Sequence, residues 1–283
     1  MTELEGSLQL QDPVLLAAFE GWNDAADAAS ATLDHLARVW KARTIATLDA
    51  DDYYDFQVNR PTVHLDNGVR TITWPTTRVL VATPPDAPRD LVLVRGIEPN
   101  MRWRQFCDEI LAVADTVGVE MCVLLGALLA DSPHTRPIPV TASATDPELA
   151  DALGLTISKY EGPTGVLGVL QDGCLRASMP AVSFWAAVPH YVAQPPCPKA
   201  TLALLRKVED LLDVAVPLGD LPEDARAWER GVDDLARDDT EVSEYVRSLE
   251  QARDAADLPE ATGEAIAKEF ERYLRRRPER GAE

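Results

Sequence analysis

Five short apolar runs in this chain each end in a loop rich in polar, aromatic and turn-forming residues. In an open α/β sheet, loops at the carboxyl ends of the strands form the crevice where ligands bind. The repetition therefore predicts an α/β fold with a site along one edge of its sheet. The runs and their loops are 14–19 with 20–24, 91–94 with 95–99, 123–129 with 131–137, a run ending at Ile157 with 160–165, and a run ending in 188–191.

The composition narrows the class of protein. With 283 residues, 46% of them hydrophobic, the chain is long enough for one α/β domain and a smaller unit. A formal net charge of −20 repels nucleic-acid phosphates and anionic lipids, so we expect neither nucleic acid nor a membrane as a partner. The longest apolar stretch, near 121–130, falls short of the roughly 20 residues that span a bilayer. Because residues 1–13 lack the features of a signal peptide, we expect a cytoplasmic protein.

Strand and helix patterns alternate over residues 1–215, which we expect to form one α/β domain. Residues 53–83 interrupt the alternation, and Asn67-Gly68 between two β-rich runs predicts an antiparallel hairpin. From 216 to 283 the spacing is helical only. Each helical pattern has one apolar stripe, at 225–235, 242–249 and 266–274. This predicts a C-terminal helical subdomain whose stripes bury against one another or against a second subunit.

The second half of the α/β domain contains a further pattern. The run ending at Ile157 is followed by a glycine-rich turn, a helical spacing over 166–174 and an apolar run over 180–188. Together these predict a βαβ unit, in which the two strands are parallel.

The sequence gives no indication of a metal or cofactor. Cys107, Cys122, Cys174 and Cys197 lie far apart and lack the close pairs of zinc sites, so we interpret them as free, buried thiols. The P-loop and Gly-x-Gly-x-x-Gly patterns are absent. We therefore expect no metal site and no cofactor.

Two histidines, His134 and His190, each follow a proline at the end of a predicted strand. Both imidazoles could lie in one crevice as general acid and base. Alternatively, each ring hydrogen-bonds backbone groups that the proline turns leave unpaired. Since no serine or cysteine lies in a nucleophile elbow, the structural interpretation is the stronger. A metal site built from the two histidines and Asp131 lacks compact ligand spacing.

Several carboxylates belong to the same predicted rim. Asp24 precedes a helical pattern and is interpreted as a helix cap, whereas Glu98 and Glu161 are harder to explain in this way. Gly162-Pro163-Thr164-Gly165 begins a helical pattern, where free backbone amides could bind an anion. A tight turn with Thr164 as the N-cap explains those four residues nearly as well.

The rim candidates are expected to converge. If the strand order follows the pattern above, residues remote in sequence surround one crevice, with Trp22, Glu98, His134, Tyr160 and His190 at its centre. The full set of candidate binding residues is Glu20, Trp22, Asp24, Arg60, Glu98, Asp131, His134, Arg136, Tyr160, Glu161, Thr164, His190 and Tyr191.

Five segments in this order resemble the PAC2 family, which is related to proteasome assembly chaperone 2, and its actinobacterial branch in particular. They are 19–24, Arg60-Pro61, 131–137, 160–165 and 188–191. The resemblance spans about residues 10–215 and continues into the tail, as far as 269–274. It implies a three-layer domain similar to the phosphorylase/hydrolase-like fold, with a twisted mixed sheet flanked by helices. It also implies self-association, for which a trimer is the leading expectation.

The resemblance and the rim lead to different hypotheses. Family members in eukaryotes and archaea help 20S proteasome α-subunits to assemble, which implies an oligomeric, non-catalytic protein with a proteasome-related partner. Some related chaperones dock through a C-terminal hydrophobic-Tyr-x tail. This chain ends in 280–283 without one, so we expect a different contact surface.

The alternative is a small-molecule enzyme or ligand-binding protein, similar to nucleoside phosphorylases and hydrolases, with its site at the carboxyl edge of the sheet. A pocket enclosing His134, Tyr160 and His190 would favour this alternative, and a flat apolar face would favour the chaperone-like protein.

Overall fold

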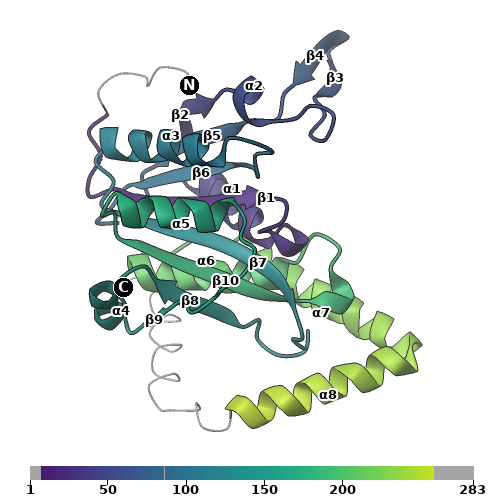
Figure 1. Cartoon of the computed structure of the whole chain (residues 1–283). Helices are drawn as coiled ribbons and strands as arrows, with labels where there is room; N and C mark the ends of the chain where they lie inside the picture. The colour runs from purple at the N-terminus through teal and green to yellow at the C-terminus, as the bar shows by residue number, and fades with distance from the viewer. Residues whose placement is uncertain (1–7, 86, 258–283) are drawn as a thin grey trace, which may run out of the picture.

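Figure 1 shows a computed structural model of the chain, in which residues 8–85 and 87–257 are described. Its centre is an eight-stranded mixed sheet, so the predicted α/β class is confirmed. The four middle strands are parallel, and antiparallel pairings flank them on both sides. The strand order is β2 (Arg43–Leu48), β5 (Thr77–Ala82), β6 (Leu91–Ile97), β1 (Val14–Glu20), β7 (Met121–Ala130), β10 (Ala181–Pro189), β8 (Val140–Ala144) and β9 (Thr156–Ile157).

Continuous apolar sequence explains why the middle strands lie inside. Every residue of β1 from Val14 to Phe19 is fully buried. A parallel strand covered on both faces requires such a run, because its side chains point alternately to two cores. Val14 accordingly lies opposite Leu91 on one side and Met121 on the other.

Helices cover both faces of the sheet and make three layers (Figure 1). One core joins the sheet to α1 (Ala28–Val39) and α6 (Pro198–Leu212), and the other joins it to α3 (Trp103–Thr116) and α5 (Val166–Arg176). The apolar side chains of each helix recur at helical spacing, so one face of each is buried. The short helices are η1 (Ala25–Asp27), α2 (Ala50–Tyr53), α4 (Pro147–Leu153) and η2 (His190–Val192).

The predicted hairpin is present as β3 (Thr62–Asp66) and β4 (Val69–Thr73), which form a separate two-stranded sheet. Asn67 and Gly68 both have positive φ, 48° and 81°, as a tight hairpin turn requires. In Figure 1 the hairpin projects from the body beyond the edge of the main sheet. The region also contains β5, which our pattern did not predict because its six residues directly follow the hairpin.

The predicted βαβ unit is wrong. Strand β9 pairs in parallel with β8, and β8 pairs antiparallel with β10, so β9 runs opposite to β10 and is separated from it. The parallel neighbour of β10 is β7. The short, small and polar sequence of β8 gave no strand signal, and without β8 the pairing could not be inferred.

The predicted C-terminal helices are present as α7 (Leu221–Asp238) and α8 (Thr240–Asp257). Ala225 and Val232 of the first expected stripe are buried, whereas Leu235 is 66% exposed and does not belong to it. The third expected helix, at 266–274, lies outside the described residues. The division of the chain into 1–215 and 216–283 stays a prediction.

Three further observations concern the described residues as a group. All four cysteines are free and buried, as expected. Within residues 8–85 and 87–257, no helix combines the length and the apolar character needed to span a membrane. In the same ranges no cluster of three or more histidine, cysteine or acidic side chains is placed to hold a metal ion.

Candidate functional site

The loops that follow β6, β1, β7 and β10 lie at one edge of the sheet, because the four strands are parallel neighbours. His134 follows β7 and His190 follows β10, so the structure brings the two histidines together. Tyr191 lies between them, with its ring centroid 5.8 Å from each imidazole and nearly perpendicular to both. The edge divides into a covered half around these rings and an open half around Glu98.

His134 is 1% exposed and fully hydrogen-bonded. Its backbone N–H donates to the Tyr191 hydroxyl over 2.8 Å, and its Nδ1 lies 2.8 Å from the same oxygen. Its Nε2 lies 3.0 Å from Oδ1 of Asp233 on α7. One assignment satisfies every group, with the Tyr191 hydroxyl donating to Nδ1 and Nε2–H donating to Asp233. The ring therefore connects the rim to the tail and is not free to accept a substrate proton.

His190 lies closer to solvent, with 45% of its side chain exposed. Its Nδ1 is 3.2 Å from Oδ1 of Asp131, which also accepts from the Tyr245 hydroxyl of α8 over 2.9 Å. The Tyr245 ring also packs edge-to-face on His190, at 5.4 Å between centroids. Burial raises the pKa of Tyr191 to about 12, so its hydroxyl stays protonated at neutral pH. The second tail helix thus covers the aromatic cluster.

Arg136 fixes the same helix. Its Nε and Nη2 each donate to Asp254 over 2.8 Å, and Nη1 lies 3.3 Å from Glu250. The bidentate bond to Asp254 raises the pKa of the guanidinium and lowers that of the carboxyl. Thr135 donates a further bond to Glu250. The loop after β7, interpreted from sequence as part of an open site, is therefore occupied by the chain's own tail.

The open half contains Glu98. Its Oε1 accepts from Asn23 Nδ2 over 2.6 Å and from the backbone N–H of Val166 over 2.7 Å. Glu98 therefore caps α5, a helix that lies 68 residues away in the sequence. This carboxylate already occupies the helix start, where the sequence allowed either a bound anion or a tight turn with Thr164 as the N-cap. The cap position is Gly165, and Thr164 makes no cap hydrogen bond.

Asp24 and Glu20 have structural partners as well. Asp24 accepts from the backbone N–H groups of Ala29 and Ser30 at the start of α1, over 2.6 and 3.2 Å, in agreement with the expected cap. Burial raises the pKa of Asp24 to about 6. Glu20 forms an ion pair with Arg95 at 2.6 Å. Neither carboxylate is free to hold a ligand.

The remaining candidates lie apart from the histidines. Strand β9 runs opposite to the four middle strands, so it ends at the edge of the sheet where those strands begin. The segment that carries Tyr160, Glu161 and Thr164 leads from there to α5. All three are exposed, and the Tyr160 hydroxyl donates to the Pro163 carbonyl over 2.8 Å. Trp22 is 66% exposed on the open half, and Arg60 is exposed at the base of the hairpin.

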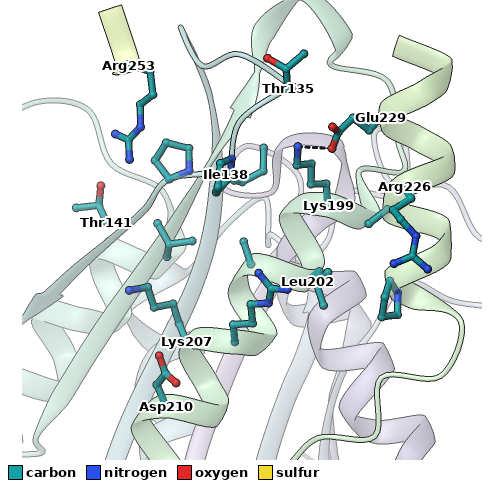
Figure 2. A pocket seen from close by; sticks show the side chains of 17 residues that line it. Thr135, Ile138, Thr141, Lys199, Leu202, Lys207, Asp210, Arg226, Glu229 and Arg253 are labelled. Carbon is teal, nitrogen blue, oxygen red and sulfur yellow. Dashed lines mark hydrogen bonds and ion pairs between the residues drawn. The ribbon is translucent and has the colours of Figure 1, made fainter. Parts of the chain in front are cut away.

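A cavity of about 810 Å³ lies beside the covered half (Figure 2). We call it the basic hollow. The segment from Thr135 to Thr141 forms one wall, and α6 and α7 form the others, with Arg253 of α8 pointing in from above. Apolar side chains line its floor, among them Ile138 and Leu202. The charged side chains are Lys199, Arg206, Lys207, Arg226 and Arg253, with Asp210 and Glu229 as the acids.

The charge of this hollow contrasts with that of the whole chain. Five basic and two acidic side chains line it, whereas the chain carries −20. Lys199 bonds both Glu229 and the His134 carbonyl, so it also ties the hollow to the covered rim. The Arg206 Nε is buried and has no hydrogen-bond partner among the described residues. Neither His134, Tyr160 nor His190 lines the hollow.

Sequence reasoning missed most partners of the rim. Asp233, Tyr245, Glu250 and Asp254 belong to helices that were interpreted by their apolar stripes alone. The spacing of Glu250 and Asp254, one helical turn apart, was the available signal for an arginine facing α8. The basic side chains of the hollow come from three helices, and no local spacing joins them.

Comparisons with known proteins identify a family and similar structures. The model of the PAC2 family matches residues 18–236. A PAC2 family protein from Streptomyces avermitilis has 66% sequence identity and a TM-score of 0.79, over 83% of this chain and 100% of that chain. A Mycobacterium tuberculosis protein described as a proteasome-assembly chaperone homologue has 56% identity and a TM-score of 0.76, over 82% and 99%.

A more distant structure shares the fold. PbaB from Pyrococcus furiosus, described as an archaeal proteasome activator, is 17% identical with a TM-score of 0.65, over 82% of this chain and 96% of that chain. The comparison with curated proteins gave no match.

Proposed function

This chain belongs to the PAC2 family, and on that basis we propose that it is an oligomeric, non-catalytic protein of the proteasome-assembly-chaperone type, acting in the cytoplasm on a proteasome-related protein partner. The observation that supports this most directly is the state of His134. The ring is buried, bonded at both nitrogens and covered by the tail, so the general acid/base that an enzyme at this edge would need is already engaged.

We place the partner contact in the basic hollow. Its apolar floor and basic walls suit a segment with both apolar and acidic side chains. The net charge of −20 disfavours a broad contact with another acidic protein, whereas a local basic groove admits a short acidic segment. The hollow also provides a contact surface that does not depend on the C-terminal residues.

The test is complex formation with separately purified proteasome α-type subunits, measured by size-exclusion chromatography with light scattering. We expect the wild type to form a complex and the R206E/K207E variant to lose it. The variant R43E/R104E carries the same charge change at exposed positions outside the hollow and should bind as wild type does. Because R206E places a second acid near Asp210, the milder R206Q/K207Q serves as a folding control and should weaken binding to a smaller degree.

A second function has one observation in its favour. The volume of the hollow lies within the range of small-molecule sites, and its charge suits an anionic ligand. Thermal-shift titration with inorganic phosphate and with citrate tests this, together with extraction of metabolites from the purified protein. Stabilisation by either anion in the wild type, lost in R206Q/K207Q, would favour the ligand-binding protein. Binding of α-type subunits without any anion effect would favour the chaperone-like protein.

A further inference from the structure

One border of the main sheet is only half paired. β8 pairs with β10 over its whole length, Val140–Ala144. The other side of β8, in the described part of the chain, pairs with β9 alone and only at Ser143 and Ala144. The first half of β8 therefore lies at the border of the sheet, with no strand paired to its outer side among the described residues.

The pairing with β10 determines which backbone groups of β8 point outward. The Ala187 N–H donates to the Pro139 carbonyl over 2.9 Å, so Pro139 is at a hydrogen-bonded position. In an antiparallel pair such positions alternate with positions that turn both backbone groups away from the partner strand. Val140 and Ala142 therefore turn theirs outward. Within residues 8–85 and 87–257, the Val140 N–H and C=O and the Ala142 N–H have no hydrogen-bond partner. We call these three groups the free strand edge.

The free strand edge belongs to a wall of the basic hollow. Val140 and Thr141 line the hollow, as does the segment that precedes them from Pro137 onward. Helix α6 forms the wall across from them, and Figure 2 shows Thr141 on one side and Leu202 of α6 on the other. The cavity of about 810 Å³ leaves room for further polypeptide beside β8.

The side-chain pattern of β8 shows where the residues of an added strand would point. Val140 and Ala142 pack against the core beneath α6, so their side chains lie on the α6 side of the sheet. Because neighbouring strands share the same pleat, every second side chain of an added strand would lie on that side as well. There it would meet Arg206 and Lys207. The buried Arg206 Nε, which lacks a partner among the described residues, would gain an acceptor.

The charge of the hollow selects what can pair with this edge. An unpaired strand edge promotes unwanted association, and basic side chains beside it repel basic segments. Five basic and two acidic side chains line the hollow, so an acidic segment is attracted to it. The backbone groups require an extended chain, since a helix satisfies its own N–H and C=O groups internally. Both requirements are met by an extended segment with carboxylates at alternate positions.

We propose that the protein partner inserts an extended acidic segment into the basic hollow, where it binds as an added strand on the free strand edge of β8. Main-chain hydrogen bonds to Val140 and Ala142 hold the segment, and its alternate carboxylates reach Arg206 and Lys207. This inference rests on the proposed function, which places the partner contact in this hollow, and it specifies how the partner binds there.

The probe is a short synthetic peptide, capped at both ends, in which glutamate alternates with valine. Fluorescence anisotropy with the full chain at 0.15 M salt measures its binding. We expect R206Q/K207Q to weaken binding by at least about tenfold, because charge-assisted hydrogen bonds are lost. R43Q/R104Q makes the same change at exposed positions outside the hollow and should bind as wild type does. Equal binding by the two variants, or equal binding of a peptide with lysine in place of glutamate, would overturn the inference.

Amide hydrogen exchange, measured by NMR, determines whether the peptide binds as a strand. In the free protein we expect slow exchange at Thr141, which bonds β10, and fast exchange at Val140 and Ala142. The peptide should slow exchange at Val140 and Ala142 by at least about tenfold. Binding without this protection would mean that side chains alone hold the peptide, and the strand would be refuted. Protection of both amides in the free protein would mean that another segment of the chain or a second copy covers the edge, which overturns the inference too.

Backbone N-methylation of the peptide provides an independent test. Alternate N–H groups of a strand point to opposite sides, so only one of the two alternate sets can bond β8. Of two peptides methylated at one set or the other, one should lose binding and the other should keep it. Equal affinities of the two would contradict strand addition.

The inference and the proposed function can fail separately. If α-type subunits bind through the hollow and leave exchange at Val140 and Ala142 unchanged, the partner remains and the added strand is refuted. If the peptide protects both amides and no α-type subunit binds, the strand site remains and the proteasome-related partner is refuted. Circular dichroism melting of each variant checks that it folds.

Discussion

At the scale of single residues, Asp24 shows how burial and hydrogen bonding oppose each other. Its carboxylate accepts two backbone N–H bonds, which favour the charged form, yet the side chain is 4% exposed. Burial is the larger effect and raises the pKa from 3.8 to about 6. In the folded protein the group therefore holds its proton more tightly than in the unfolded chain.

The pH dependence follows from the sign of that shift. Since the folded pKa is the higher one, Asp24 contributes stability that is fully present below pH 3.8 and is lost as pH rises through about 6. Asp24→Asn removes this titration and keeps one cap acceptor. We therefore compare the free energies of unfolding in urea of wild type and variant. The wild-type value minus the variant value should be about 2 kcal/mol larger at pH 4.5 than at pH 7.5. Equal differences at the two pH values would contradict the raised pKa.

Position 165 requires glycine, because the Asn23 side chain lies too close to leave room for a Cβ atom. A Cβ at this position would lie 2.3 Å from Asn23 Oδ1, and its φ of −96° is one that any residue adopts. Gly165→Ala should therefore destabilise by roughly 1–3 kcal/mol through crowding alone. Gly231→Ala in α7 is the matched control, because a Cβ there would meet no atom within 4 Å, and it should stabilise by about 0.5–1 kcal/mol. Thermal melting of the two variants provides the comparison.

His134 and His190 should contribute differently to stability, because His134 is buried and His190 is exposed. The double variant H134Q/H190Q keeps hydrogen-bonding groups and removes imidazole titration, so we expect it to fold and to bind the same protein partner. Most of any stability loss, about 1–3 kcal/mol, should come from the buried His134. If a reproducible turnover is found in the wild type and is lost in the folded double variant, the chaperone-like function is refuted.

At the scale of elements, α7 and α8 differ in how they are held. Trp228 and Leu221 of α7 pack against the core beneath α1 and α6, whereas α8 meets the rim through Tyr245, Glu250 and Asp254. Exposed ion pairs contribute little stability, and apolar burial contributes more. The first tail helix is therefore held mainly by core burial, whereas the second is held by polar contacts, by the packing of the Tyr245 ring and by the buried Val246.

Two truncations test this difference and the predicted division at residue 215. A chain ending at Asp239 should keep its fold with a loss of about 1–2 kcal/mol, while amide exchange in 131–136 and 190–192 increases. A chain ending at 215 should lose at least about 3 kcal/mol, because Val216, Leu221 and Trp228 no longer cover the core. Equal stability of the two chains in urea would show that α7 is a separate unit.

At the scale of the whole molecule, a charge of −20 per chain opposes association. The repulsion acts over the Debye length, about 30 Å at 0.01 M salt and about 8 Å at 0.15 M. Raising the salt concentration should therefore strengthen the self-association that we propose for this chain. Sedimentation velocity at both salt concentrations is the measurement. Dissociation at the higher concentration would mean that the local ion pairs dominate the interface.

Local patterns predicted those elements whose signals lie within a few residues. The apolar run 14–19 specified β1, Asn67-Gly68 specified the hairpin turn, and the position of Asp24 specified a cap. In each case the physical cause is local: burial on both faces, positive φ at two residues, or free amides at a helix start. The β9 pairing failed because a two-residue strand has no periodicity to set its partner.

The sequence alone determined the sheet's apolar centre, the hairpin and the polar character of the loops at one edge. Only the tertiary structure decided what those loops do. Glu98 caps a helix 68 residues away, and Arg136 bonds an aspartate 118 residues away. Such contacts depend on which side chains the chain's path brings together, and no local spacing encodes that path. A loop that looks like an open site can therefore be filled by the same chain.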